Sequence, residues 1–139
     1  MLNRTSPLLL VFVIVLNVWA EKGTEKSLDV VQTSLQSKQF GRSIDQIDSL
    51  LKIADQKIDF LIYLKALASF HTRDFQRSIN ACQQLVSNYP DSIWLRKTTF
   101  LQAKCYFDLK DFSSAEAIYD TEVERLLSST RKSNIAKVY

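Results

Sequence analysis

Hydrophobic residues recur every three or four positions over most of the chain, which places them on one face of a helix. Six such stripes follow one another, separated by short polar segments. Their apolar members, in chain order, are Leu28, Val31 and Leu35; Phe40, Ile44, Ile47, Leu50 and Leu51; Phe60, Tyr63, Leu64, Leu67 and Phe70; Phe75, Ile79, Cys82, Leu85 and Val86; Phe100, Ala103, Tyr106 and Phe107; and Phe112, Ala115, Ile118, Tyr119, Val123 and Leu126. The pattern therefore predicts six helices arranged as three hairpins.

One short motif returns along the chain. Phe40–Ile44 (FGRSI) recurs as Phe75–Ile79 (FQRSI) 35 residues later, and a looser copy starts at Phe112 after a further 37 residues. A fixed period in this range is typical of helical-repeat arrays. With two Gly and two Pro in 139 residues, the chain is poor in the turn residues that a sheet protein needs. We therefore expect an all-α solenoid with repeats over residues 27–55, 56–90 and 91–130.

Proline and short polar residues mark the expected helix ends. Pro90 cannot continue the helix before it, and Asp91 or Ser92 can cap the helix that follows. Asp74 and Asp111 each precede a motif phenylalanine, where a carboxylate can accept the free N–H groups of a first helical turn and complement the helix dipole.

Aligned on Asp74-Phe75 and Asp111-Phe112, the segments resemble tetratricopeptide repeats. The motif positions are occupied by Ala66, Phe70, Ser78, Cys82, Leu85 and Pro90 in the second repeat, and by Ala103, Tyr106, Phe107, Ala115, Tyr119 and Val123 in the third. The first repeat departs from the motif, because Gln39 stands where the others have Asp and Gly41 lies inside its second helix. The resemblance implies a right-handed superhelix whose concave side is lined by the first helix of each hairpin.

The phrase Tyr89-Pro90-Asp91-Ser92 and a slightly long third repeat resemble an exported bacterial subgroup of these proteins. That subgroup includes the outer-membrane assembly lipoprotein and the periplasmic Tol–Pal coordinator. No Cys lies near residue 20, so the lipid attachment site of the assembly lipoprotein is missing.

Residues 1–20 have the three parts of a secretory signal. Arg4 is their only charge, Leu8–Val18 is an apolar run, and Val18-Trp19-Ala20 offers small residues before a cut ahead of Glu21. The run is shorter than the roughly 20 residues of a membrane span, and an uncleaved anchor is the alternative. We expect residues 21–26 to be a polar linker and the protein to be exported to the periplasm or the cell surface.

A further apolar pattern begins at residues 131–139, with Ile135, Ala136, Val138 and Tyr139. Either it forms a short helix that caps the array, or the chain is the N-terminal module of a larger exported protein. In the second case the main activity lies beyond residue 139.

Charge and motif content disfavour several functions. The net charge of +3 is mild, and no basic stripe favours nucleic acid. Motifs for a nucleophile elbow, a phosphate loop or a zinc protease are missing, and one His with two isolated Cys indicates no metal site. We therefore predict no enzymatic activity, no cofactor and no metal.

Cys82 and Cys105 lie 23 residues apart at apolar, helix-facing positions. Two interpretations stay open: both are buried free thiols, or export allows a disulfide between neighbouring helices.

The resemblance places several candidate partner-binding residues on the concave side. They are Tyr63, Phe70, His71, Lys97, Lys104, Phe107 and Asp108, with Leu67 and Phe100 beside them. Aromatic residues with flanking Lys suit an extended peptide or a partner subunit. The alternative is that the aromatic residues are core, the lysines are solvated, and His71 is exposed or hydrogen-bonded at a helix end.

Trp94 is a further candidate, since it follows an expected helix start. It is either a staple at the helix entrance or an exposed anchor for a partner. Together these features predict a non-catalytic scaffold of the cell envelope that binds a protein or peptide, and homo-oligomers are a further prediction.

Overall fold

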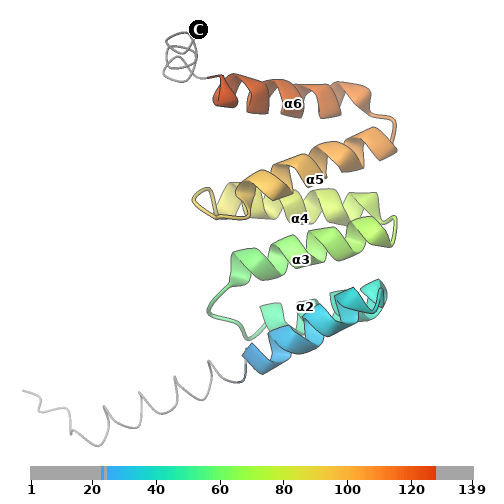
Figure 1. Cartoon of the computed structure of the whole chain (residues 1–139), viewed down its shortest axis with the longest axis vertical. Helices are drawn as coiled ribbons and strands as arrows, with labels where there is room; N and C mark the ends of the chain where they lie inside the picture. Colours follow the sequence, from blue (N-terminus) through green and yellow to red (C-terminus); the bar gives the residue numbers. More distant parts are fainter. Residues whose placement is uncertain (1–22, 24, 128–139) are drawn as a thin grey trace, which may run out of the picture.

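The computed structural model describes residue 23 and residues 25–127, and these residues form helices and turns without a strand. Residues 25–36 are helical, and five further helices follow: α2 (Phe40–Leu51), α3 (Ile58–His71), α4 (Phe75–Asn88), α5 (Leu95–Asp108) and α6 (Phe112–Leu126). Figure 1 shows α2 to α6 stacked in chain order along the long axis of the molecule. The predicted all-α repeat fold is confirmed.

Consecutive helices pack against each other from α2 to α6, and α3 also contacts α5. Two buried apolar clusters hold the array together. The first joins residues 25–36, α2 and α3 through Leu28, Val31, Ile47, Leu50, Leu61 and Leu64. The second joins α3 and α4 through Ile62, Ala66, Ala81, Cys82 and Leu85. Fully buried alanines allow neighbouring helices to approach closely, and larger residues fill the remaining space.

The turn inside each hairpin has the same backbone geometry three times. Lys38, Arg73 and Lys110 each adopt a left-handed conformation, with φ of 58°, 63° and 66°. In each turn the next residue donates its N–H to a carbonyl five residues earlier: Gln39 to Ser34 at 2.9 Å, Asp74 to Ser69 at 3.0 Å and Asp111 to Tyr106 at 2.9 Å. This is the bonding pattern that closes a helix before a tight turn. The turn of the first hairpin therefore has the same geometry as the turns of the other two.

The motif aspartates cap their helices as expected. Asp74 Oδ1 accepts a hydrogen bond from Arg77 N at 3.1 Å, and Asp111 Oδ1 accepts one from Ser114 N at 3.1 Å. Gln39 makes no side-chain cap for α2. The departure of the first repeat from the motif therefore weakens a helix cap without changing the turn.

The predicted ends of the array lie partly outside the described residues. Residues 1–20 and 131–139 are outside, and so are residues 128–130 of the predicted third repeat. Residues 25 and 26, which were expected to belong to a linker, are helical. Glu and Lys are good helix formers, so the first helix starts before its apolar stripe. Over the described part of the chain, the helices are too short or too polar to cross a bilayer.

Candidate functional site

Trp94 directly precedes α5 and forms an aromatic cluster with the first half of α3. Its ring stacks on Phe60, with centroids 4.6 Å apart and planes 29° apart, and on Tyr63, at 5.0 Å and 15°. The side chain is half-buried. Both predicted roles of Trp94 are therefore compatible with its position, because it packs on α3 and still reaches the surface.

A short chain of hydrogen bonds holds Trp94 in this place. Ser92 Oγ accepts from the N–H of Trp94 at 3.1 Å and donates to Asp59 Oδ2 at 2.5 Å. The other carboxylate oxygen of Asp59 accepts from the N–H of Phe60 at 2.8 Å. The connection before α5 is thus tied to the start of α3, 33 residues earlier.

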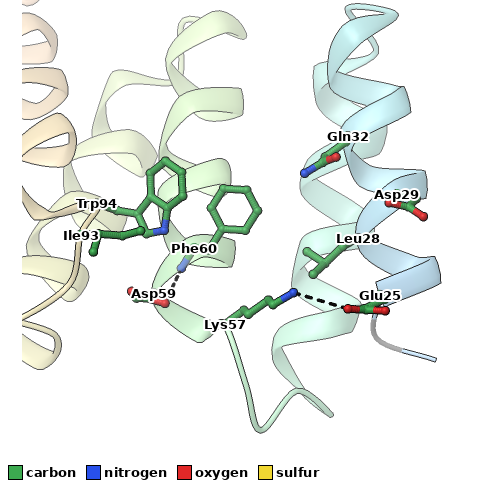
Figure 2. A pocket seen from close by; sticks show the side chains of 9 residues that line it. All are labelled: Glu25, Leu28, Asp29, Gln32, Lys57, Asp59, Phe60, Ile93 and Trp94. Carbon is green, nitrogen blue, oxygen red and sulfur yellow. Dashed lines mark hydrogen bonds and ion pairs between the residues drawn. The ribbon is translucent and has the colours of Figure 1, made fainter. Parts of the chain in front are cut away.

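A hollow of about 530 Å³ opens beside this cluster, and we call it the aromatic hollow. Its lining residues are Glu25, Leu28, Asp29, Gln32, Lys57, Asp59, Phe60, Ile93 and Trp94. Figure 2 shows Leu28 and Gln32 facing Phe60 across the gap, with Lys57 reaching toward Glu25. Lys57 Nζ and Glu25 Oε1 are 4.0 Å apart. The hollow has apolar walls and a charged rim, which is the usual composition of a ligand-binding cleft.

Two neighbouring groups shape the electrostatics of the cluster. Lys97 Nζ lies 5.3 Å from the centre of the Trp94 ring, within the range of a cation–π interaction. Burial raises the pKa of the Tyr63 hydroxyl, and the nearby Cys82 thiol raises it further. Tyr63 is therefore a neutral hydrogen-bonding group at physiological pH.

The family comparison matches this part of the chain. Residues 60–92 match the family model described as Tetratricopeptide repeat. This segment of the chain is similar to a tetratricopeptide repeat. The matched segment begins at Phe60 and ends at Ser92, so it includes Phe60 and Tyr63, which stack on Trp94, and Ser92, whose hydroxyl accepts from the Trp94 N–H. Searches of curated proteins and of solved structures found no match.

Tetratricopeptide repeats generally mediate protein–protein interaction and are typically non-catalytic scaffolds. In the described residues, no group of three or more His, Cys, Asp or Glu side chains is placed to hold a metal ion.

The other end of α3 carries a second aromatic cluster. His71 is exposed, stacks on Phe40 at 4.6 Å and meets Phe70 edge-on at 5.7 Å. Lys104 Nζ lies 4.8 Å from the centre of the Phe70 ring. The predicted site residues are therefore divided: Tyr63, Trp94 and Lys97 share one end of α3, whereas Phe70, His71 and Lys104 share the other.

The remaining predicted residues belong to the α5–α6 hairpin. Phe107 is 52% exposed and packs edge-on against Phe112 at 5.3 Å. Phe100 lies 6.0 Å from Tyr119, and Asp108 is exposed. These aromatic rings line the junction between α5 and α6. They are neither buried core residues nor part of the cluster around Trp94.

Both cysteines are free and buried at the interface of α4 and α5. Burial raises the pKa of the Cys82 thiol to about 12, with Cys105 adding to the effect. Cys105 Sγ lies 3.2 Å from Ser78 Oγ and donates to it. The thiols therefore stay protonated in the folded repeat, and the disulfide stays a prediction.

The residues that complete the aromatic hollow have no distinctive signal in the sequence. Phe60 belongs to a helix stripe, and Gln32, Lys57 and Ile93 lie in no motif. The meeting of Phe60 with Trp94 depends on how two hairpins pack, and no local pattern in the sequence encodes that packing.

Proposed function

We propose that this protein is a non-catalytic scaffold that holds a segment of a partner protein in the aromatic hollow. The observation that carries the proposal is Trp94, which stacks on two aromatic rings and still lines an open hollow of about 530 Å³. Tryptophan is enriched among the residues that dominate binding energy at protein interfaces.

The hollow suits a protein segment better than a small reacting molecule. Leu28, Phe60 and Ile93 offer apolar contact, while Gln32 and the Lys57–Glu25 pair can hydrogen-bond a peptide backbone. The walls come from helices that are packed into the core, so the hollow is largely preformed. A preformed site avoids part of the ordering cost of binding.

The cellular location is a further part of the proposal. A signal-like pattern in residues 1–20 supports export to the periplasm or the cell surface. Sequencing the N-terminus of the protein recovered from the cell envelope tests this, since a chain beginning at Glu21 is the expected product. A chain that retains Met1 contradicts cleavage.

The alternative proposal, an N-terminal module of a larger exported protein, is supported by one surface. Phe112, Tyr119 and Val123 of α6 remain partly exposed, and a further helix could cover them. Sequencing the transcript past codon 139 distinguishes this proposal from an independent scaffold.

Two variants of the first helix test the aromatic hollow. Gln32→Trp fills the hollow from the side that faces Phe60, whereas Gln36→Trp adds the same bulk one turn later on an exposed position outside it. Each is used as bait in a pull-down from an envelope fraction, followed by mass spectrometry. We expect the partner to be lost with Gln32→Trp and retained with Gln36→Trp.

Photo-crosslinking gives an independent readout. Ile93 is 84% exposed on the rim of the hollow, and Ile53 is 81% exposed away from it. A photoreactive amino acid at position 93 should capture the partner, and the same group at position 53 should not. Equal capture at both positions would show that binding does not use the aromatic hollow.

A further inference from the structure

A second hollow, of about 420 Å³, lies between the start of α5 and the end of α6, and we call it the basic hollow. Its lining residues are Ser92, Ile93, Leu95, Arg96, Lys97, Glu122 and Arg125. It shares Ile93 with the aromatic hollow, so the two open on either side of the same exposed side chain. Among its lining residues, only Lys97 was a candidate from the sequence.

The basic hollow has an excess of positive charge. Arg96, Lys97 and Arg125 face a single carboxylate, that of Glu122. None of the ion pairs among residues 25–127 includes Arg96. Lys97 has the Trp94 ring as its neighbour, which leaves its ammonium N–H donors available.

Glu122 orients Arg125 without using up its donors. Its Oε2 accepts from Nε of Arg125 at 3.0 Å and from Nη2 at 2.5 Å. A guanidinium has five N–H donors in a planar fork, so three remain for another acceptor. Glu122 is only 9% exposed and is held in the wall of the hollow.

The aromatic hollow has the opposite balance of charge. Glu25, Asp29 and Asp59 outnumber Lys57 there. Ile93 therefore separates a basic hollow from an acidic one, and a partner segment that crosses Ile93 meets a different charge on each side.

We propose that the basic hollow binds a carboxylate-bearing segment of a partner protein, with an Asp or Glu side chain among Arg96, Lys97 and Arg125 and an adjacent apolar residue on Ile93. Arginine forks match the planar geometry of carboxylates, and the flanking apolar surface favours a side chain over a free ion. The basic hollow is a second contact surface beside the aromatic hollow. The proposal for it can be tested independently of the proposal for the aromatic hollow.

Synthetic peptides test the proposal on the full chain carrying Trp19→Phe, in which Trp94 is the remaining tryptophan. Three end-blocked, dye-labelled peptides share the same leucines and carry Glu, Gln or Lys at the intervening positions. Binding is followed by dye anisotropy and by Trp94 emission, which should respond when a carboxylate draws Lys97 away from the ring. We expect the Glu peptide to bind about tenfold or more tightly than the Gln peptide, and more weakly as salt is added.

Two charge-reversal variants distinguish binding in the basic hollow from a general effect of the protein's net charge on peptide affinity. Arg96→Glu should weaken the Glu peptide about tenfold or more, whereas Lys52→Glu, an exposed residue at the end of α2, should leave its affinity unchanged. Gln32→Trp should also leave it unchanged, which distinguishes failure here from failure of the aromatic hollow.

Four results would overturn the proposal. One is equal binding of the Glu and Gln peptides, and another is equal loss with Arg96→Glu and Lys52→Glu. The third is the absence of Glu-peptide binding at millimolar concentration. Displacement of the bound peptide by an equal concentration of inorganic phosphate would also overturn it, because the hollow would then be a general anion site.

Discussion

The α3–α4 and α5–α6 hairpins share one repeat pattern but are packed very differently. In α3–α4 the buried residues are Leu61, Ile62, Leu64, Ala66, Ala68, Ser69, Ser78, Ile79, Ala81, Cys82 and Leu85. In α5–α6 they are Thr98, Ala103, Cys105, Ala115 and Glu122. The α3–α4 hairpin has α2 packed on one side and α5 on the other, whereas α6 packs mainly on α5 among the described helices.

The difference in packing between the two hairpins is clear at one repeat position, occupied by Leu85 in α4 and by Glu122 in α6. Leu85 of α4 is fully buried in the second apolar cluster. Shifting by the 37 residues that separate Phe75 from Phe112 leads from Leu85 to Glu122. The same position is thus core in one hairpin and a wall of the basic hollow in the other. The inner hairpin, α3–α4, is therefore the better packed one, and the outer hairpin, α5–α6, is the one for which we propose a role in recognition.

The largest expected effect is on the inner hairpin. Leu85→Ala leaves a cavity where three helices meet and should lower the free energy of unfolding by about 2–5 kcal/mol. Val123→Ala in α6, where the side chain is exposed, should change it far less. Chemical denaturation of both variants checks this, and similar losses would show that the two hairpins contribute equally.

The second prediction concerns Ala103, one of the few buried positions of the outer hairpin. Ala103 is fully buried at the repeat position that Ala66 occupies in α3. Ala103→Trp should therefore cost on the order of 1–3 kcal/mol or more, while Ala117→Trp on the exposed side of α6 should cost little. Thermal melts that do not separate these variants would refute the alignment of the two hairpins.

A smaller effect concerns a hydrogen bond that the outer hairpin lacks. Ser78 Oγ donates to Ala66 O at 2.8 Å and accepts from Cys105, whereas the equivalent residue of α6 is Ala115. Ser78→Ala should destabilise the protein by about 1 kcal/mol. Ser113→Ala, at an exposed position, is the matched control in the same denaturation experiment.

Placing leucine at position 122 of α6 should change peptide binding more than it changes the stability of the protein. Glu122→Leu gives α6 the residue that α4 has, and it releases Arg125 from its carboxylate. We expect a thermal midpoint close to that of the wild type and tighter binding of the acidic peptide. Weaker binding would indicate that the orientation of Arg125 matters more than the charge of the hollow.

The smallest expected effect is a pH dependence at the start of α6. Hydrogen bonds from the Ser114 hydroxyl and N–H lower the pKa of Asp111 below its ordinary value of 3.8. The ionised cap therefore stabilises the fold above that value, and its contribution is lost as the pH falls through the lowered pKa. Asp111→Asn should flatten the dependence of the melting temperature on acid pH. Identical pH profiles for the two proteins would contradict this.

Much of the fold could be predicted because its determinants are local. Helix stripes and aspartate caps each depend on a few neighbouring residues, and the structure contains the expected hairpins and both caps. The starting point of the first helix was less predictable, since Glu25 and Lys26 suit both a helix and a polar linker.

The candidate site was less predictable because it is made of distant residues. The sequence pointed to Trp94 and Lys97 but could not pair them with Phe60 or separate them from Phe107. The sequence also offered no reason to select Arg96 or Arg125 as site residues. They line one hollow only because α5 and α6 pack side by side.

Periodicity, capping residues and the recurrent motif, then, are enough to determine the all-α repeat architecture, because each acts within one helix or one turn. The tertiary structure alone decided that Ile93 separates an aromatic hollow from a basic one. The physical reason is that both hollows are formed by side chains from different hairpins, and only helix packing determines which of them meet.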